Sequence, residues 1–162
     1  MHDATRSTFE RALPAIDRVL EVLFYAAYAL LIAVLLLEGA PAGDSAPINP
    51  LLLPRIVVPA AGFVFVSVLR RIINAPRPYE TNAAEPLIRK ETKGRSVPSK
   101  HAYSSFMIAL CWWHVSLPAS IFLLVAAWAT SAVRVAGGVH FARDVAAGAA
   151  IAFACAARMF LW

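Results

Sequence analysis

Charged residues are scarce in this chain, and their scarcity indicates the class of protein. Only 15% of the 162 residues are Asp, Glu, Lys or Arg, and 60% are hydrophobic, whereas soluble domains have about 25% charged residues. The mean hydropathy is +0.65. Because a bilayer core takes roughly 20 apolar residues per helix, residues 1–162 predict a single membrane-embedded, all-α domain with about five spans.

Several kinds of site are also missing from the sequence. Cys111 and Cys155 are the only cysteines, and both lie in apolar stretches, which favours packing over a disulfide or a metal site. There is no glycine-rich phosphate loop, which disfavours a nucleotide-driven kinase or pump. No His or carboxylate pair near the motifs described below has metal-ligand spacing, so we expect no metal and no other cofactor. Residues 1–18 mix both signs of charge, which is unlike a cleavable signal peptide.

Apolar runs separated by proline and glycine define the expected helices. An amphipathic interfacial helix is expected over residues 2–18, and spans are expected at about 19–37, 51–69, 102–115, 119–133 and 145–162. Pro59 should kink the second span unless neighbouring helices compensate. Five spans alternate sides, so the polar segments 70–100 and 134–144 should face the same compartment as the N-terminus.

Two histidines at the ends of these spans are candidates for chemistry. His140 and Asp144 are four residues apart, so they share one face if the segment is helical. A carboxylate bonded to one ring nitrogen would fix the tautomer and leave the other nitrogen free to attack. As an alternative, Asp144 would only cap the last helix. His101, at the start of the third span, is expected to act as a general acid, or else to be an interfacial residue without a role.

Cations of the same segments complete a predicted anion site. Arginines offer planar, permanently charged forks that suit phosphate oxygens, and the N-terminus of the third helix adds a partial positive charge. Any one arginine at a helix end could merely extend toward the membrane surface. Several cations around two histidines instead favour a phosphate pocket, formed by Arg70, Arg77, Ser99, Lys100 and Arg134.

At these residues the chain resembles the type 2 phosphatidic acid phosphatase superfamily, whose fold is shared with vanadium haloperoxidases. The family signature reads K-x6-R-P, P-S-G-H and S-R-x5-H-x3-D. This sequence has R-x6-R-P from Arg70, P-S-K-H from Pro98 and V-R-x5-H-x3-D from Val133, in the same order, within a motif-bearing core of about residues 51–162. It departs from the signature at Arg70, Lys100 and Val133, and it is one span short of the usual six.

The resemblance implies a role for each matching position. His140 would form a phosphohistidine intermediate, Asp144 would orient it, and His101 would protonate the leaving group and then serve as base for water. The remaining matches would hold the phosphoryl oxygens, namely Arg70, Arg77, Ser99, Lys100 and Arg134.

We therefore expect an integral membrane, metal-independent lipid phosphate phosphatase. Its substrate would be phosphatidic acid, phosphatidylglycerophosphate, or a polyprenyl phosphate or diphosphate. The alternatives are an undecaprenyl-diphosphate phosphatase that recycles a cell-wall lipid carrier, a non-catalytic lipid-binding membrane protein, and an oxidative enzyme of the haloperoxidase type. The joint presence of His101, His140 and Asp144 argues against the non-catalytic alternative.

The expected partners are the lipid phosphate substrate and membrane lipids, with no nucleic acid, because the cations that give the net charge of +5 cluster between spans. Self-association into a homo-oligomer is left open. A multi-pass location in a bacterial plasma membrane is expected. Residues 19–54 contain no Lys or Arg, so by the positive-inside rule the active-site face is expected to be cytoplasmic.

Overall fold

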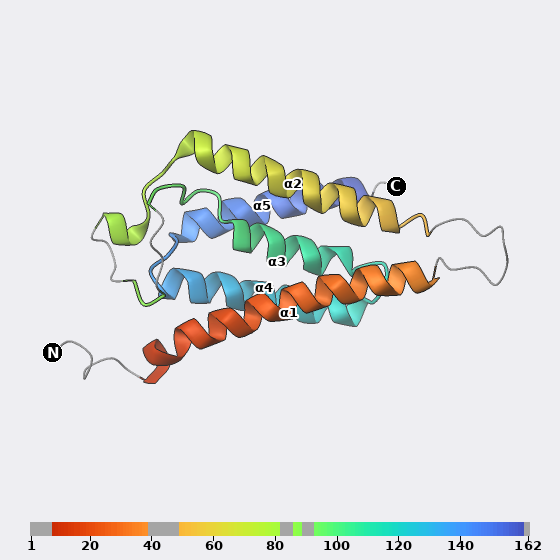
Figure 1. The fold of residues 1–162 in the computed structure, drawn as a ribbon, viewed down its shortest axis with the longest axis horizontal. Helices are drawn as coiled ribbons and strands as arrows, with labels where there is room; N and C mark the ends of the chain where they lie inside the picture. The colour runs from red at the N-terminus through yellow and green to blue at the C-terminus, as the bar shows by residue number, and fades with distance from the viewer. Residues whose placement is uncertain (1–7, 39–48, 82–85, 89–92, 161–162) are drawn as a thin grey trace.

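The computed structural model describes residues 8–38, 49–81, 86–88 and 93–160. Within these ranges the chain is helical and contains no strand, which confirms the all-α prediction. The elements in chain order are α1 (Thr8–Glu38), α2 (Leu52–Ile73), the 3-10 turn η1 (Pro78–Glu80), α3 (Lys100–Cys111), α4 (Leu117–Ala136) and α5 (Ala142–Phe160). The five α-helices lie side by side in an elongated bundle (Figure 1).

Helix α3 is the centre of the bundle, because it contacts each of the other four α-helices. Every residue from Ser105 to Cys111 is buried. With 12 residues, α3 is about 18 Å long, which is less than the roughly 30 Å of a hydrocarbon core. Its function in the fold is to place its first turn, which begins at Lys100, at one end of the bundle.

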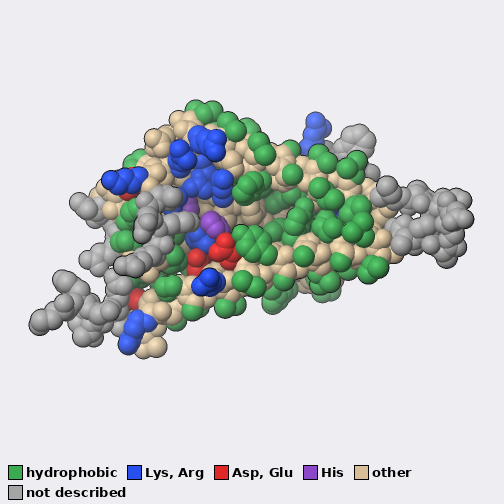
Figure 2. All heavy atoms as spheres, in the orientation of Figure 1, with side chains coloured by type: hydrophobic (Ala, Val, Ile, Leu, Met, Phe, Trp, Pro, Cys, Tyr) green, Lys and Arg blue, Asp and Glu red, His purple; other side chains and the backbone are tan. Residues whose placement is uncertain are grey.

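The outer surface of the bundle is apolar. Three helices of the described ranges are long and apolar enough to cross a membrane, namely Glu10–Glu38, Leu52–Glu80 and Leu117–Ala136. Large apolar side chains on them point outward, and Leu37 and Val125 are 74% and 65% exposed. Figure 2 shows hydrophobic side chains along much of the bundle, with histidine and most of the visible charged side chains gathered at one end. This distribution is that of a membrane protein; the count of five spans remains a prediction.

The start of α1 differs from the expected arrangement. The sequence predicts a separate interfacial helix over residues 2–18, but residues 8–18 continue without a break into α1, and residues 2–7 lie outside the described ranges. No glycine or proline occurs between residues 15 and 38, so nothing interrupts the helix. This boundary was predicted wrongly, and the correction places Asp17 and Glu21 on one face of a single helix.

Neighbouring helices compensate for the proline inside α2. Pro59 has no N–H to donate to the carbonyl oxygen of Arg55, four residues earlier. The hydroxyl of Tyr28 in α1 donates to this oxygen at 2.8 Å. The carbonyl oxygen of Pro59 itself accepts from the hydroxyl of Tyr103 in α3 at 3.0 Å. The helix therefore continues through Pro59 with its carbonyl groups satisfied.

The three motif stretches, which begin at Arg70, Pro98 and Val133, lie at the same end of the bundle, as the alternation of spans predicts. The segment after α2, the turn between α4 and α5, and the start of α1 are all at this end (Figure 1). Gly137 is the C-cap of α4, and Gly138 has a φ of 70°, a left-handed conformation that glycine adopts at little cost. This turn brings residues 139–141 back toward the start of α5.

Candidate active site

His140 and Asp144 are in contact, as their spacing predicts, although His140 lies in the turn before α5 and not on a helical face. Nδ1 of His140 lies 3.4 Å from Oδ2 of Asp144, and neither side chain has exposed surface. The same carboxylate oxygen accepts from the backbone N–H of Phe141 at 3.0 Å and from the hydroxyl of Ser96 in a short hydrogen bond. Asp144 therefore binds the start of α5 and orients the imidazole at the same time, and Nε2 lies on the other side of the ring.

The charge of Asp144 is maintained by its hydrogen bonds. This residue is in the first turn of α5, outside the three candidate spans. Burial acts to raise the pKa of the Asp144 carboxyl, but the hydrogen bonds from His140, Ser96 and the Phe141 amide outweigh burial and hold the pKa below its ordinary value. The group is thus a carboxylate at neutral pH, which is the form that stabilises a positive charge on His140.

The second motif is attached to α5 by a close backbone contact. The N–H of Ser99 donates to the carbonyl oxygen of Asp144 at 2.8 Å. The hydroxyl of Ser99 caps α3 by accepting from the N–H of Ala102 at 3.4 Å. A Cβ atom at Gly148 would lie 2.4 Å from the carbonyl oxygen of Ser99, so only glycine permits this approach.

Arg134 joins the end of α4 to His101 in the first turn of α3. Its Nη1 donates to Nδ1 of His101, 3.2 Å away. Its Nε lies 2.7 Å from Oδ1 of Asp17, and its Nη2 lies 4.0 Å from Oε2 of Glu21. The side chain of Arg134 is only 4% exposed, and a guanidinium so deeply buried is stabilised by opposite charge. Two acidic residues of α1 therefore belong to the site.

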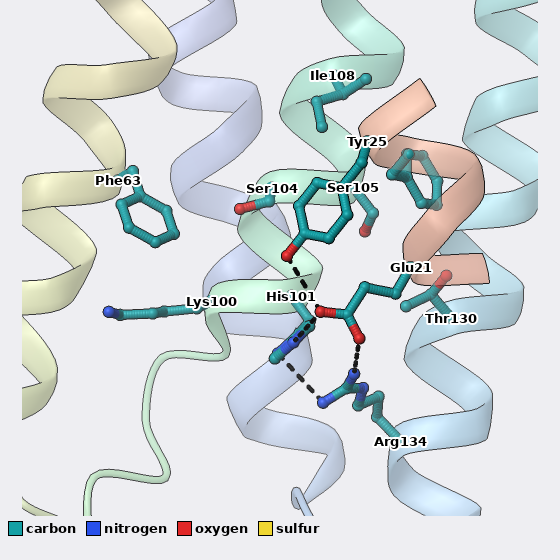
Figure 3. A pocket seen from close by; sticks show the side chains of 11 residues that line it. Glu21, Tyr25, Phe63, Lys100, His101, Ser104, Ser105, Ile108, Thr130 and Arg134 are labelled. Carbon is teal, nitrogen blue, oxygen red and sulfur yellow. Dashed lines mark hydrogen bonds and ion pairs between the residues drawn. The ribbon is translucent and has the colours of Figure 1, made fainter. Parts of the chain in front are cut away.

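A pocket of about 200 Å³ opens beside this group. Lys100, His101, Arg134 and Glu21 form its charged side. Phe24, Phe63 and Ile108 contribute apolar walls, and the hydroxyl side chains of Tyr25, Ser104, Ser105 and Thr130 complete the lining. Figure 3 shows Glu21 between His101 and Arg134, with the Tyr25 hydroxyl donating to Oε1 of Glu21 at 3.0 Å. A pocket with charges on one side and apolar walls elsewhere suits a phosphate attached to an apolar chain.

A second pocket, of about 460 Å³, is lined chiefly by cations. Its walls are Ser67, Arg70, Arg71, Arg77, Lys93, Gly94, Arg95 and Lys100. Arg70 and Arg77 are buried, and their guanidinium groups donate to the carbonyl oxygens of Arg95 and Gly94, respectively. Burial, together with the charges of Arg70, Arg71 and Arg95, lowers the pKa of the Lys100 ammonium. Among the described residues, no carboxylate lines this pocket. Positive groups held this close together favour a bound anion.

The structure brings the predicted residues to one end of the bundle in three groups: His140 with Asp144 and Ser99, His101 with Arg134, and Arg70 with Arg77 and Lys100. Lys100 lines both pockets. Nη1 of Arg77 donates to the carbonyl oxygen of Val139, next to His140, at 3.5 Å. The His140 side chain lines neither pocket and has no exposed surface. A phosphate must therefore displace a neighbouring side chain to reach Nε2.

Sequence reasoning missed four residues of the site: Asp17, Glu21, Tyr25 and Ser96. The first three recur every four residues along α1, and acidic side chains in or beside an apolar run are costly. That pattern was a usable signal. Ser96 lies in an irregular segment between α2 and α3, where no periodicity indicates which way a side chain points.

The family model described as "PAP2 superfamily" matches residues 51–162, which is more than half of the chain. The chain belongs to the PAP2 superfamily. The crystal structure of LpxE from Aquifex aeolicus matches with a TM-score of 0.70 and 22% identity, over 100% of each chain. At this identity the likeness shows a shared fold. No curated protein sequence matches the chain.

Membership of the PAP2 superfamily makes the chain a lipid phosphatase of the membrane, as the resemblance implied. The match begins at residue 51, so α1, with Asp17 and Glu21, lies outside the matched region. Among the described residues, no group of three or more His, Cys, Asp or Glu side chains is placed to hold a metal ion. Independence from metal, the side of the membrane and self-association remain predictions.

Proposed function

We propose that this PAP2 phosphatase hydrolyses the phosphomonoester or diphosphate headgroup of a membrane lipid, without a metal ion, through a phosphohistidine on His140. The observation that carries the proposal is the buried His140–Asp144 pair, with 3.4 Å between Nδ1 and Oδ2. A carboxylate on one ring nitrogen makes the other a directed nucleophile. The neighbouring cations supply the anion site that a transferred phosphoryl group requires.

In the first step, Nε2 of His140 attacks phosphorus, and the bond from phosphorus to the lipid oxygen breaks. Asp144 stabilises the positive charge that develops on His140, and His101 gives a proton to the leaving oxygen. The phosphoryl oxygens are held by Arg70, Arg77, Arg134, Lys100 and Ser99. The Ser99 hydroxyl can donate to phosphate while its oxygen continues to cap α3, because a hydroxyl both donates and accepts.

In the second step, water attacks the phosphohistidine. His101, which is now neutral, takes a proton from the water, the nitrogen–phosphorus bond breaks, and inorganic phosphate leaves. The enzyme returns to its starting protonation state, so no cofactor is consumed. The apolar walls of the smaller pocket, on α1, α2 and α3, would receive the part of the lipid nearest to the leaving oxygen.

A diphosphate is the second candidate headgroup, in line with an undecaprenyl-diphosphate phosphatase. It is favoured by the excess of positive charge in the larger pocket, where six of the eight described lining residues are Lys or Arg. A diphosphate carries more negative charge than a monoester and would use more of these cations.

Phosphate release by the purified protein tests the proposal. The assay uses detergent micelles with EDTA and separate lipids: phosphatidic acid, phosphatidylglycerophosphate, a polyprenyl phosphate and a polyprenyl diphosphate. Release from at least one lipid, abolished in His140→Ala and by orthovanadate, is expected. His114→Ala is the matched control, because His114 is exposed in the turn after α3, at the opposite end of the bundle. Activity lost on chelation and restored by a divalent ion would contradict the metal-free mechanism.

A further inference from the structure

The two ring nitrogens of His101 have different neighbours. Nδ1 is 3.2 Å from Nη1 of Arg134. Because an arginine N–H can only donate, Nδ1 must accept, and the ring proton is assigned from this partner to Nε2. Nε2 faces α1 and lies 3.8 Å from Oε1 of Glu21. In this state His101 is neutral and has no proton on the nitrogen that faces Arg134.

This arrangement changes when Arg134 turns its N–H groups to a phosphate. Nδ1 is then released next to the same phosphate and can take a proton from solvent, which makes the ring an imidazolium. Its Nε2–H still points toward Glu21. His101 would then have a carboxylate near Nε2 and the reacting phosphate near Nδ1. In a Ser-His-Asp triad the same arrangement, with a carboxylate at one ring nitrogen and the reacting atoms at the other, orients and stabilises the histidine.

The two acids of α1 both lie near Arg134, but Glu21 also lies 3.8 Å from His101. Asp17 is 2.7 Å from Nε of Arg134 and its side chain is only 10% exposed, so it holds the arginine from behind. Glu21 is 35% exposed, lines the smaller pocket and is held by the Tyr25 hydroxyl at 3.0 Å. Glu21 is therefore placed to act on His101 and, at a slightly longer distance, on Arg134 (Figure 3). Asp17 is placed to act on Arg134.

We propose that Glu21 is a positioning residue for the acid–base step: it orients His101 through Nε2 and stabilises the imidazolium that gives its Nδ1 proton to the leaving oxygen. The inference rests on the proposed function. In the attack, the Nδ1 proton passes to the lipid oxygen as its bond to phosphorus breaks. In hydrolysis, a proton of the attacking water returns to Nδ1. Glu21 remains ionised throughout, so protons balance over the cycle.

A pair of substrates with different leaving groups tests this role. A lipid alkyl phosphate needs a proton on its leaving oxygen, whereas a nitrophenyl phosphate does not. General acid catalysis contributes on the order of 10²–10⁴ in rate, and Glu21→Gln should remove about 10- to 100-fold of kcat on the alkyl phosphate. On the nitrophenyl phosphate we expect a loss of less than about threefold. Glu21→Asp should recover part of the rate, and Tyr25→Phe should show a smaller loss with the same dependence on the leaving group.

The pH profile gives an independent readout. His101 is faced by Glu21 of α1 and Arg134 of α4, and it shares its pocket with Tyr25 of α1 and Lys100 of its own helix. Asp17 of α1 contacts Arg134. Removal of the negative charge at Glu21 makes the imidazolium less stable. The decline of kcat at high pH should therefore begin at lower pH in Glu21→Gln than in the wild type.

Two control variants separate positioning from structure. Glu38→Gln changes an exposed acid at the opposite end of the same helix and should leave both substrates unaffected. Asp17→Asn should raise KM for both substrates alike, because it loosens Arg134. Thermal unfolding shows whether Glu21→Gln is folded; if it is not, Glu21→Asp and Tyr25→Phe serve as the test.

Three results would overturn the inference. Equal losses on the two substrates would indicate a structural role. If the wild type is active, an unchanged rate in Glu21→Gln would show that Glu21 does not assist His101. An increased rate would show, in addition, that Glu21 competes with phosphate. A wild type that releases phosphate from no substrate would overturn the proposed function and this inference together.

Discussion

Gly148→Ala tests whether the contact between α5 and the start of α3 assembles the site. The new Cβ would lie 2.4 Å from the carbonyl oxygen of Ser99, which is a backbone atom, so the two segments must separate by about 1 Å to reach the 3.4 Å of ordinary contact. The hydrogen bond from the Ser99 N–H to the Asp144 carbonyl oxygen, now 2.8 Å, would then lengthen to about 3.8 Å and be lost.

The free-energy terms for this substitution do not cancel. Overpacking costs about 1–3 kcal/mol, and the buried donor left without its partner costs about 1–3 kcal/mol. Alanine in a helix recovers about 1 kcal/mol relative to glycine. We therefore expect Gly148→Ala to destabilise the protein by about 1–5 kcal/mol and to reduce kcat, because Ser99 and His101 move away from His140.

Thermal unfolding in detergent and phosphate release per folded protein measure the two effects. Gly62→Ala is the matched control, because its Cβ would lie 2.0 Å from the Tyr103 hydroxyl, away from the motif residues. It should lower the unfolding temperature and leave the rate per folded protein near the wild-type value. Wild-type stability and activity in Gly148→Ala would refute the argument that this approach holds the site together.

Three further substitutions probe other parts of the account. The pKa of Asp144 is lowered in the folded state, so its contribution to stability is present above the unfolded-state pKa and is lost as the pH falls through the folded-state pKa. Asp144→Asn should therefore flatten the dependence of thermal stability on acidic pH. The same substitution should reduce kcat far more than it changes KM. Tyr28→Phe should lower the free energy of unfolding by about 1–3 kcal/mol. The loss should be smaller in a Pro59→Ala background, because the N–H of residue 59 can then donate to the carbonyl oxygen of Arg55. An equal loss in both backgrounds, measured by denaturation, would contradict the argument that Tyr28 compensates for Pro59. Lys100→Gly should raise KM more than it lowers kcat, and steady-state kinetics that show the reverse would remove Lys100 from the phosphate pocket.

The sequence was most informative where a contact is local. The four-residue spacing of His140 and Asp144 predicted their contact, and the structure has it at 3.4 Å, although His140 lies before the first residue of α5 and not on its helical face. The alternation of spans predicted that distant motifs would meet at one end of the bundle, because each crossing reverses the side. The first inference depends on the short separation of two residues across the turn before α5. The second depends on the helical spans, which the apolar periodicity already indicates.

Contacts between helices could not be predicted in the same way. The orientation of Arg134 depends on which neighbour offers it a charge, and the neighbour proved to be Asp17 on a helix 117 positions earlier. The misplaced helix boundary at residue 19 concealed this, since it assigned Asp17 to the membrane surface and separated it from Glu21. The close approach at Gly148 was equally hidden, because small residues are common throughout α5.

Helix α1 contributes charged side chains to the site of this chain, although it lies outside the region that matches the PAP2 family. The matched region begins at residue 51, yet Arg134 and His101, both within it, have charged neighbours from α1. Removal of α1 should therefore impair catalysis, and not only insertion into the membrane. The variants at Asp17 and Glu21 separate these two effects, because each changes one side chain and leaves the span in place.

The central claim is that the phosphoryl group passes through His140, and trapping of the intermediate tests it most directly. The protein is mixed with a ³²P-labelled lipid phosphate, quenched in alkali within one turnover and analysed by mass spectrometry. The account predicts an acid-labile, alkali-stable phosphoryl group on His140, absent from His140→Ala and retained for longer in Asp144→Asn. Turnover by the wild type with no phosphoryl group on His140, or with the group on another residue, would contradict it.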